Sequence, residues 1–440
     1  MMVRWQQSIW LIGVCVGFAL MVSCGESSSD PVPWQGGAAG TAVAGSGGSD
    51  TGGGQAATGG GGQAGAGDGG QAGTVVPTYG APETVDGYAL GGSAYGGGPE
   101  YPTLAPVPAA NTATTFTELK SKVEAATTGQ VVFVPSGTTI TFGADDTITV
   151  PAGVTIASDR GKDGAAGGML KKSESPGGYQ GYMLAIGGDN VRITGLVLEG
   201  EMIEEGGEHP QGGESYLLMG IKNPSSYSGT GYGGLLVDNC EIRGWGYAGV
   251  FVQGIPTATR PHIHHCYVHH NNAAHMGYGC NVNGGDMLVE ANVFDWNRHS
   301  VSAGGLVGER YEVRYNLHLG HGSQTGGYHY DVHENEHYAD DGVACAGTEY
   351  HIHHNTVNQG SGTAQMAFSH IRDNPIVGAY INNNLIDTYW GDYGSTNDDG
   401  APSVIYKSHD YSETHAGVFC TDNQWHGVVY PTNDGILWLM

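Results

Sequence analysis

Ile352-His353-His354-Asn355 is one copy of a four-residue phrase that recurs down the C-terminal half of the chain. Each copy has an aliphatic residue, then two mostly polar residues, then Asn or Cys. The other copies are Val237-Asp238-Asn239-Cys240, Ile263-His264-His265-Cys266, Val289-Glu290-Ala291-Asn292, Val313-Arg314-Tyr315-Asn316, Ile381-Asn382-Asn383-Asn384 and, more loosely, Cys420-Thr421-Asp422-Asn423. The spacing starts in the mid-twenties and is lengthened by later insertions. Such a period indicates stacked supersecondary units.

The segments between these phrases alternate between apolar and polar residues, which is typical of short β-strands and not of helices. Stacking such units places strand on strand at the ~4.8 Å spacing of a sheet. The sequence therefore predicts an all-β fold, a right-handed parallel β-helix.

The Asn or Cys that ends each phrase is expected at a sharp corner between two sheets. Asn tolerates the left-handed backbone region that such a corner requires, and stacked Asn amides can hydrogen-bond along the column. Cys240 and Cys266 occupy the same slot in neighbouring coils, where a small thiol packs in the interior. We expect both to be core residues without a disulfide.

The first folded element is expected to be a helix that covers the open end of the solenoid. Thr115-Phe116-Thr117-Glu118 is a capping box, and Phe116, Leu119 and Val123 fall on one face of the helix that follows. An amphipathic helix at this place would protect the edge of the first coil.

The N-terminal region has the composition of an exported and tethered protein. Residues 1–24 combine Arg4, an apolar run and Met21-Val22-Ser23-Cys24, which resembles a lipobox with Cys24 as the lipidation site. An ordinary signal peptide or a single membrane anchor is the alternative. Residues 25–106 are Gly/Ala/Ser-rich and predict a disordered tether, and residues 107–440 form the β-helix domain. We expect an outer-membrane or cell-surface protein that contacts the membrane only through its lipid anchor.

The charge of the chain restricts its partners. The formal net charge is −27 with 16 Lys and Arg residues. Nucleic acid is excluded as a partner, because binding phosphate groups requires clusters of basic residues.

Three segments near the start of the β-helix domain carry a resemblance to a known superfamily. Gln130-Val131-Val132-Phe133-Val134-Pro135, Gly153-Val154-Thr155-Ile156 and Asn190-Val191-Arg192-Ile193-Thr194-Gly195-Leu196 resemble the entrance to pectate-lyase-like right-handed β-helix proteins. The likeness covers roughly residues 107–440. Later phrases, such as Gly277-Tyr278-Gly279 and Asp331-Val332-His333, are similar to secreted bacterial β-helix repeat proteins. The resemblance implies a polysaccharide as substrate or ligand.

Polar residues on the second strand of each coil mark the candidate site, because alternate residues of a strand point to opposite faces. We expect Cys280, Val282, Val301, Ala303, Tyr328, Tyr330 and Val332 to point inward. The expected outward residues are Asn281, Asn283, Ser302, His329, Asp331 and His333. His370 and Arg372 flank the inward Ile371, and a bulge would reverse this register.

The segment His329-x-Asp331-x-His333 is the sharpest chemical signal. Histidines at this spacing can share a metal ion, and calcium or another divalent metal is left open, also near Asp340 and Asp341. In the favoured interpretation, Asp331 orients a histidine that acts as general base.

Neighbouring coils are expected to complete this site. Arg298 and His299 enter the groove from the side, and Arg372 binds a carboxylate or oxyanion. Tyr278, Asn281, Asn283, Ser302 and His370 are expected to bind substrate. The repeated histidines His264, His265, His353 and His354 are interpreted as solvated turn residues.

These features favour a surface-anchored polysaccharide lyase that acts by β-elimination on a uronate-containing glycan. Elimination requires a base, His333 or His329, and a cation, Arg372 or Arg298, that neutralises the carboxylate. A β-helix glycoside hydrolase is an alternative, which would need paired carboxylates among Asp331, Asp340 and Asp341. A non-catalytic glycan-binding or adhesin lipoprotein is another.

Overall fold

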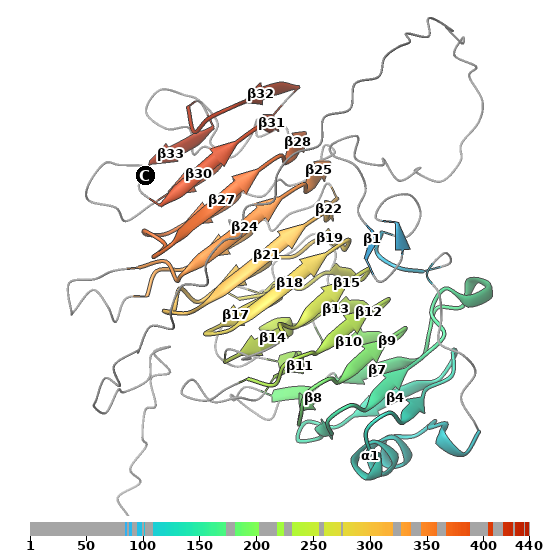
Figure 1. Ribbon diagram of the computed structural model, residues 1–440. Helices are drawn as coiled ribbons and strands as arrows, with labels where there is room; N and C mark the ends of the chain where they lie inside the picture. The colour runs from blue at the N-terminus through green and yellow to red at the C-terminus, as the bar shows by residue number, and fades with distance from the viewer. Residues whose placement is uncertain are drawn as a thin grey trace, which may run out of the picture. The chain divides into compact units, whose positions relative to one another are not determined.

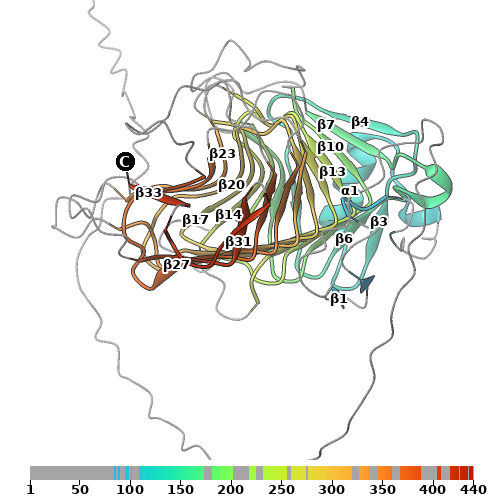
Figure 2. The same ribbon diagram turned by 90° about the horizontal axis from the view of Figure 1, so that it is seen from above.

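Three parallel β-sheets wind around one apolar interior in the computed structural model (Figures 1 and 2). The structure describes residues 84–85, 88–89, 95–98, 101, 109–172, 181–201, 218–223, 231–254, 259–273, 276–319, 327–335, 345–358, 367–387, 404–407, 417–425, 427–434 and 436–439. Residues 1–73 form a separate unit from residues 74–440 and lie outside this set. None of the helices described is long and apolar enough to cross a membrane.

Through most of the cylinder, each coil contributes one strand to each sheet in turn, so that strands three apart in number are neighbours. Sheet I contains β3 (Val131–Phe133), β6 (Thr155–Ala157), β9 (Arg192–Thr194), β12 (Leu236–Asp238), β15 (His262–His264), β18 (Asp286–Glu290), β21 (Arg310–Arg314), β24 (Glu349–His353), β27 (Gly378–Asn382) and β30 (Val418–Thr421). Sheet II contains β4 (Thr139–Phe142), β7 (Met169–Lys172), β10 (Val197–Glu199), β13 (Glu241–Arg243), β16 (Tyr267–His269), β19 (Val293–Asp295), β22 (Leu317–His318), β25 (Thr356–Asn358), β28 (Leu385–Asp387), β31 (Asn423–Trp425) and β32 (Val428–Tyr430).

Sheet III contains β5 (Ile148–Val150), β8 (Gly181–Ile186), β11 (Leu218–Lys222), β14 (Ala248–Gln253), β17 (Tyr278–Asn283), β20 (His299–Ala303), β23 (Tyr328–Val332), β26 (Ala367–Ile371), β29 (Ile405–Lys407) and β33 (Leu437–Leu439). Only β31–β32 and the hairpin of β1 (Thr84–Val85) with β2 (Tyr88–Ala89) pair antiparallel among the strands described. The predicted right-handed parallel β-helix is confirmed.

The interior is filled by columns of aliphatic side chains in register. In sheet I, Val237, Ile263, Val289, Val313 and Ile352 lie on successive strands, and all are fully buried. Burying one such side chain contributes about 1.5–3 kcal/mol. The aliphatic residue that opens each repeated phrase therefore supplies the core.

Stacked asparagines run along the corner between sheets I and II. Each Nδ2 donates to the Oδ1 of the next asparagine, at 3.1 Å for Asn292 to Asn316, 3.0 Å for Asn316 to Asn355, 3.0 Å for Asn355 to Asn384 and 2.8 Å for Asn384 to Asn423. Cys240 and Cys266 fill the same slot as buried free thiols. The predicted ladder and the predicted place of both cysteines are confirmed.

The left-handed backbone at this corner does not belong to the ladder asparagine, contrary to expectation. It belongs to the preceding residue, with positive φ at Asn239, His265, Ala291, Tyr315, His354, Asn383 and Asp422. The ladder asparagine follows the turn and can therefore point its amide inward. Side chains as different as Ala291 and Tyr315 accept this conformation because the ladder fixes the turn from inside.

Helix α1 (Phe116–Ala125) lies at the N-terminal end of the cylinder, as predicted (Figure 1). The Thr115 hydroxyl caps the helix by accepting the backbone N–H of Glu118. Leu119 and Val123 are fully buried, and Phe116 packs edge-on against Phe142 at 4.9 Å between ring centroids. The short 3-10 turns Ala109–Asn111 and Lys162–Gly164 complete the described helical segments.

Residues before the predicted domain boundary also pack on the cylinder. Tyr95 joins a buried cluster with Ala291 and Tyr315, and the Tyr101 hydroxyl donates to Asp238 at 3.0 Å. The folded contacts therefore begin before residue 107, because these two tyrosines supply the apolar surface that the Gly-rich composition around them lacks.

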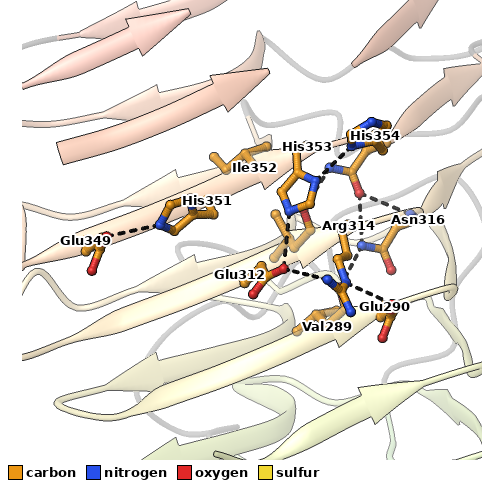
Figure 3. A network of polar contacts seen from close by, with 12 residues as sticks. Val289, Glu290, Glu312, Arg314, Asn316, Glu349, His351, Ile352, His353 and His354 are labelled. Atoms are coloured by element: carbon orange, nitrogen blue, oxygen red, sulfur yellow. Dashed lines mark hydrogen bonds and ion pairs between the residues drawn. The ribbon is translucent and has the colours of Figure 1, made fainter. Parts of the chain in front are cut away.

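The outer face of sheet I carries a ladder of alternating charges (Figure 3). Arg314 bonds Glu290 at 2.8 Å and Glu312 at 3.0 Å, and His353 Nε2 lies 3.2 Å from Glu312. Opposite charges on adjacent strands stabilise a sheet, so this ladder holds neighbouring coils in register.

The corner histidines are less solvated than predicted. His264 and His265 are fully buried, and the Tyr101 ring lies 5.1 Å from that of His265. Burial, together with the neighbouring His264, lowers the pKa of His265 to about 4. His353 and His354 keep partial exposure. The expectation of solvated turn residues is wrong for the first pair because the segment around Tyr101 covers it.

Candidate functional site

The candidate site lies on the outer face of sheet III, where four neighbouring strands align polar residues. Asn281, Ser302, Asp331 and His370 are direct partners across β17, β20, β23 and β26. Asn281 Nδ2 donates to Ser302 Oγ at 2.6 Å. Parallel pairing in register therefore produces this row, as the alternation pattern predicted.

The alternation is interrupted two residues before this row. Gly279, Ser300, His329 and Phe368 have no partner in the register and face the interior. A Cβ on Gly279 would lie 3.1 Å from Val268 and 3.2 Å from Phe294 of the core. Two consecutive residues of each strand thus point inward, and this break in alternation is repeated in step on neighbouring strands.

His329 is therefore not on the outer face, contrary to prediction. It is only 2 % exposed, and its ring lies 4.3 Å from that of His318, a buried interior residue. Burial lowers the pKa of His329 to about 3, so the imidazole is neutral and cannot serve the outer patch. The same break in alternation has the opposite effect on Tyr328. It was expected inside, but its ring stacks on His299 of the outer face at 5.6 Å.

Asp331 is the centre of the patch and is fully buried. Arg372 binds it bidentately, with Nε 3.1 Å from Oδ1 and Nη2 2.8 Å from Oδ2. His333 Nε2 lies 2.9 Å from Oδ2, His299 Nε2 3.4 Å from Oδ2 and His370 Nδ1 3.6 Å from Oδ1. Burial alone would raise the pKa of Asp331, but His333, His299 and Arg372 outweigh it and hold that pKa well below its usual value.

His333 and Arg372 form the accessible side of the patch. They follow β23 and β26 directly, and their backbone N–H groups still donate to the preceding coil, to Ala303 and Val332. The side chain of His333 is 35 % exposed and that of Arg372 is 23 % exposed. Because Nε2 of His333 faces Asp331, Nδ1 is the ring atom left to meet a ligand.

His299 is held as a neutral imidazole between two tyrosine rings. Its ring stacks on Tyr278 at 5.4 Å and on Tyr328 at 5.6 Å. Burial lowers the pKa of His299 well below its usual value, although Asp331 acts in the opposite direction. The backbone N–H of Tyr328 donates to Nδ1 at 3.0 Å. Nδ1 also lies 3.2 Å from the Tyr328 carbonyl oxygen, so the Tyr328 backbone offers Nδ1 both a donor and an acceptor, while Nε2 faces Asp331.

Arg298 adds a second cation beside this stack. Burial raises the pKa of Tyr278, whereas the charge of Arg298 and a hydrogen bond with it act to lower it. Tyr278 therefore stays protonated at neutral pH. With neutral histidines, the cluster of Arg298, His299, Asp331, His333, His370 and Arg372 has two cations and one anion. It forms a locally positive spot on a chain of net charge −27.

A metal ion fits this donor set only in part. His299, Asp331 and His333 offer ligand atoms that lie within 4.8 Å of one another. Two of these residues, His299 and Asp331, are fully buried, and His333 is the partly exposed member of the three. Arg372 also already supplies positive charge to both carboxylate oxygens. Asp340 and Asp341, the other candidates for metal binding, lie outside the described residues.

The structure thus brings together most of the predicted site. Asp331, His333, His299, His370, Arg298 and Arg372 converge, with Tyr278, Asn281 and Ser302 beside them, and Asn283 ends β17 on the same face. His329 is excluded by its inward position. Tyr328 is the residue that the sequence analysis missed. Its outward position could have been predicted from Tyr278, which was already expected to bind substrate. Tyr278 pairs with His299, and His299 pairs with Tyr328, so the three residues lie in one row.

Comparisons with known proteins give distant structural likenesses. The chain is similar to an alginate lyase from Paenibacillus sp. str. FPU-7, with 15 % identity, 75 % of this chain and 97 % of that chain covered and a TM-score of 0.42. It is also similar to a Family 28 exopolygalacturonase from Yersinia enterocolitica, with 13 % identity, 70 % and 62 % coverage and a TM-score of 0.42. No family model and no curated protein sequence matches. At this level of identity and TM-score, neither likeness carries an argument about activity.

Proposed function

We propose that this protein is a carbohydrate-active enzyme that cleaves a uronate-containing polysaccharide by β-elimination. The observation that carries the proposal is the contact of 2.9 Å between His333 Nε2 and the buried, ionised Asp331, with the opposite side of the imidazole open to a ligand. A carboxylate that holds one ring nitrogen leaves the other as an oriented general base.

The residues of the patch fit the steps of such an elimination. His333 Nδ1 would remove the proton from the carbon beside the uronate carboxyl group. The electron pair of that C–H bond forms a double bond as the glycosidic carbon–oxygen bond breaks. The positive charge of Arg298 and Arg372 would favour the anionic state that develops on the carboxyl group. Tyr278, whose phenol stays protonated, is the candidate donor to the leaving oxygen.

A hydrolase is less well supported by the same geometry. Glycoside hydrolysis needs one carboxyl group that is protonated and acts as acid. Asp331 is held ionised by its cationic neighbours and its pKa is lowered, so it does not meet this need. We also propose that the chain is exported and carries a lipid anchor at Cys24, since a polysaccharide substrate is met outside the cell.

The test is to incubate the full-length protein with polyuronates and with neutral glucans. We expect polyuronates to yield products with the ultraviolet absorbance of an unsaturated uronate. His333→Ala should abolish this absorbance without a change in melting temperature. The matched control is His351→Ala, which removes a histidine that also lies 3.1 Å from a carboxylate, Glu349, but on sheet I.

Three results would contradict the proposal in different ways. Reducing ends without the chromophore would indicate a hydrolase. Binding of the glycan without any product would indicate an adhesin. Full elimination activity in the His333→Ala variant would remove the proposed base.

A further inference from the structure

The row that contains Asp331 continues over the outer face of sheet III toward the N-terminal end. Its members are Ser302, Asn281, Phe251 and Lys222, each the direct partner of the next across β20, β17, β14 and β11. The four steps from Asp331 to Lys222 span roughly 19 Å at the ~4.8 Å spacing of paired strands. This is the length of several sugar rings laid along the axis.

Lys222 ends this row as a cation without an anionic partner. No carboxylate of the described part of the chain lies within ion-pair distance of its ammonium group, unlike Lys171, which contacts Glu199 at 2.7 Å. Lys222 Nζ lies instead 5.0 Å from the centroid of the Tyr182 ring. Burial lowers the pKa of Lys222. A half-buried ammonium group of this kind gains from an incoming anion.

Two amide oxygens on the strand between Lys222 and Asp331 also lack hydrogen-bond donors among the described residues. Asn281 and Asn283 are only 5 % and 8 % exposed, yet the Oδ1 atom of each has no hydrogen-bond donor. Leaving a buried acceptor unpaired costs about 1–3 kcal/mol. Hydroxyl groups are the donors that such oxygens would accept, and a polysaccharide offers them at regular intervals.

An apolar cluster fills the space between these polar groups. Phe251 and Tyr278 are buried together with Met219 and Ala248, and Tyr182, Tyr247 and Met276 pack against them. This cluster is separate from the interior core and lies on the outer face. Tyr182 and Tyr247 are its partly exposed aromatic members, and aromatic side chains with polar tips suit the apolar faces of sugar rings.

From these observations we infer that Lys222 and Tyr182 form a remote subsite for the carboxylate of a uronate residue. The glycan lies along the axis from this subsite, past Asn281 and Asn283, to His333. The inference rests on the proposed function for the identity of the ligand, and it adds that the protein recognises a stretch of polyanionic chain several residues long.

The test measures binding without turnover, in the full-length His333→Ala variant. Calorimetric titrations with a uronate disaccharide and with a long oligouronate are compared before and after adding Lys222→Gln. We expect Lys222→Gln to weaken binding of the long oligomer about two- to fivefold, the effect of one partly exposed ion pair. The disaccharide, bound at the His333 end, should keep its affinity.

Two control variants make this test decisive. Lys171→Gln removes a lysine of similar exposure from sheet II and should change neither affinity. Lys222→Arg keeps the charge and should keep the affinity for the long oligomer. A loss in Lys222→Gln no larger than in Lys171→Gln would overturn the subsite, as would absence of any binding of the long oligouronate.

The outcome is separable from that of the proposed reaction. Binding that depends on Lys222, in a protein that forms no unsaturated product, would support the subsite and refute the lyase. Elimination activity with equal affinities in both lysine variants would support the lyase and refute the subsite.

Discussion

Asp331 is a fully buried charge, and its energetics set the chemistry of the patch. Removing a carboxylate from water costs several kcal/mol unless partners replace the solvent. Arg372 provides two hydrogen bonds, and His333, His299 and His370 surround the remaining lone pairs. The carboxylate is stable only as one member of this group, so changing it should affect both activity and stability.

Asp331→Asn is expected to reduce elimination activity by at least about a hundredfold, because His333 loses the charge that orients it as a base. The variant also leaves the Arg372 guanidinium without its anion, and we expect a loss of about 3 kcal/mol in the free energy of unfolding. Initial rates and urea denaturation measure the two effects. Asp286→Asn is the control, since Asp286 is partly exposed and lies 3.9 Å from Arg260. It should cost less than ~1 kcal/mol, and equal losses in both variants would contradict the role given to Asp331.

His329 makes stability depend on pH. Its folded-state pKa of about 3 lies below its usual value of 6.5. As the pH falls through this window, the unfolded chain takes up a proton that the folded protein refuses. Stability is therefore complete above pH ~6.5 and is lost toward pH ~3, by ~1.4 kcal/mol per pH unit for this group.

His329→Phe should reduce the pH dependence of the free energy of unfolding on the acid side, because unfolding of the variant takes up one proton fewer. Phenylalanine suits the position because Phe368 occupies the same inward row in the next coil. Denaturant titrations between pH 4 and 7.5 measure the difference between the variant and the parent. At pH 7.5 both side chains are neutral, so that value isolates the change in packing. Parallel curves over the whole range would contradict a buried neutral His329.

At the scale of elements, the asparagine ladder decides how coils join. Asn355 Nδ2 donates to Val313 O and to Asn384 Oδ1, and its Oδ1 accepts from the backbone and the side chain of Asn316. These four bonds link three successive coils at a buried corner. The ladder explains why the repeated phrase ends on the same residue type.

Asn355→Ala should lower the free energy of unfolding by about 2–4 kcal/mol, because it leaves the Val313 carbonyl and the Asn316 amide buried without partners. Thermal and urea denaturation measure the loss. Asn382→Ala in the same corner region is the control, since among the described residues its side chain bonds only the exposed Thr421 hydroxyl, and it should change stability by less than ~0.5 kcal/mol. Similar effects of the two substitutions would show that the ladder is not the source of stability.

The same scale shows where sequence reasoning stopped. The strands of sheets I and III and the row from Asn281 to Asp331 follow from alternation, and the capping helix follows from its capping box and helical periodicity. All of these patterns depend only on residues near in sequence. The inward turn of His329 and the outward turn of Tyr328 depend on a break in alternation that is repeated in β17, β20, β23 and β26. Strict alternation assigns every second residue to one face, so it cannot predict such a break.

At the scale of the whole molecule, the N-terminal lipobox predicts an anchor. Cys24→Ala should abolish incorporation of radiolabelled palmitate and move the protein from the membrane fraction to the medium or the soluble fraction. Cys15→Ala, which changes the other cysteine of the leader, should leave both readouts unchanged. Equal fractionation of the parent and Cys24→Ala would contradict a lipid anchor.

The sequence by itself determined the architecture of this protein, because a repeated phrase with strand alternation can bury its apolar residues only by stacking coil on coil. It also identified the outer face of sheet III as the candidate site, since the polar residue types there differ from coil to coil although packing of the core does not require it. Only the tertiary structure decided which side chains meet. The bidentate pairing of Arg372 with Asp331, the stacking of His299 between Tyr278 and Tyr328, and the position of Lys222 over the Tyr182 ring are contacts between different coils. Those contacts depend on turns, breaks in alternation and exact strand register, which local patterns do not specify.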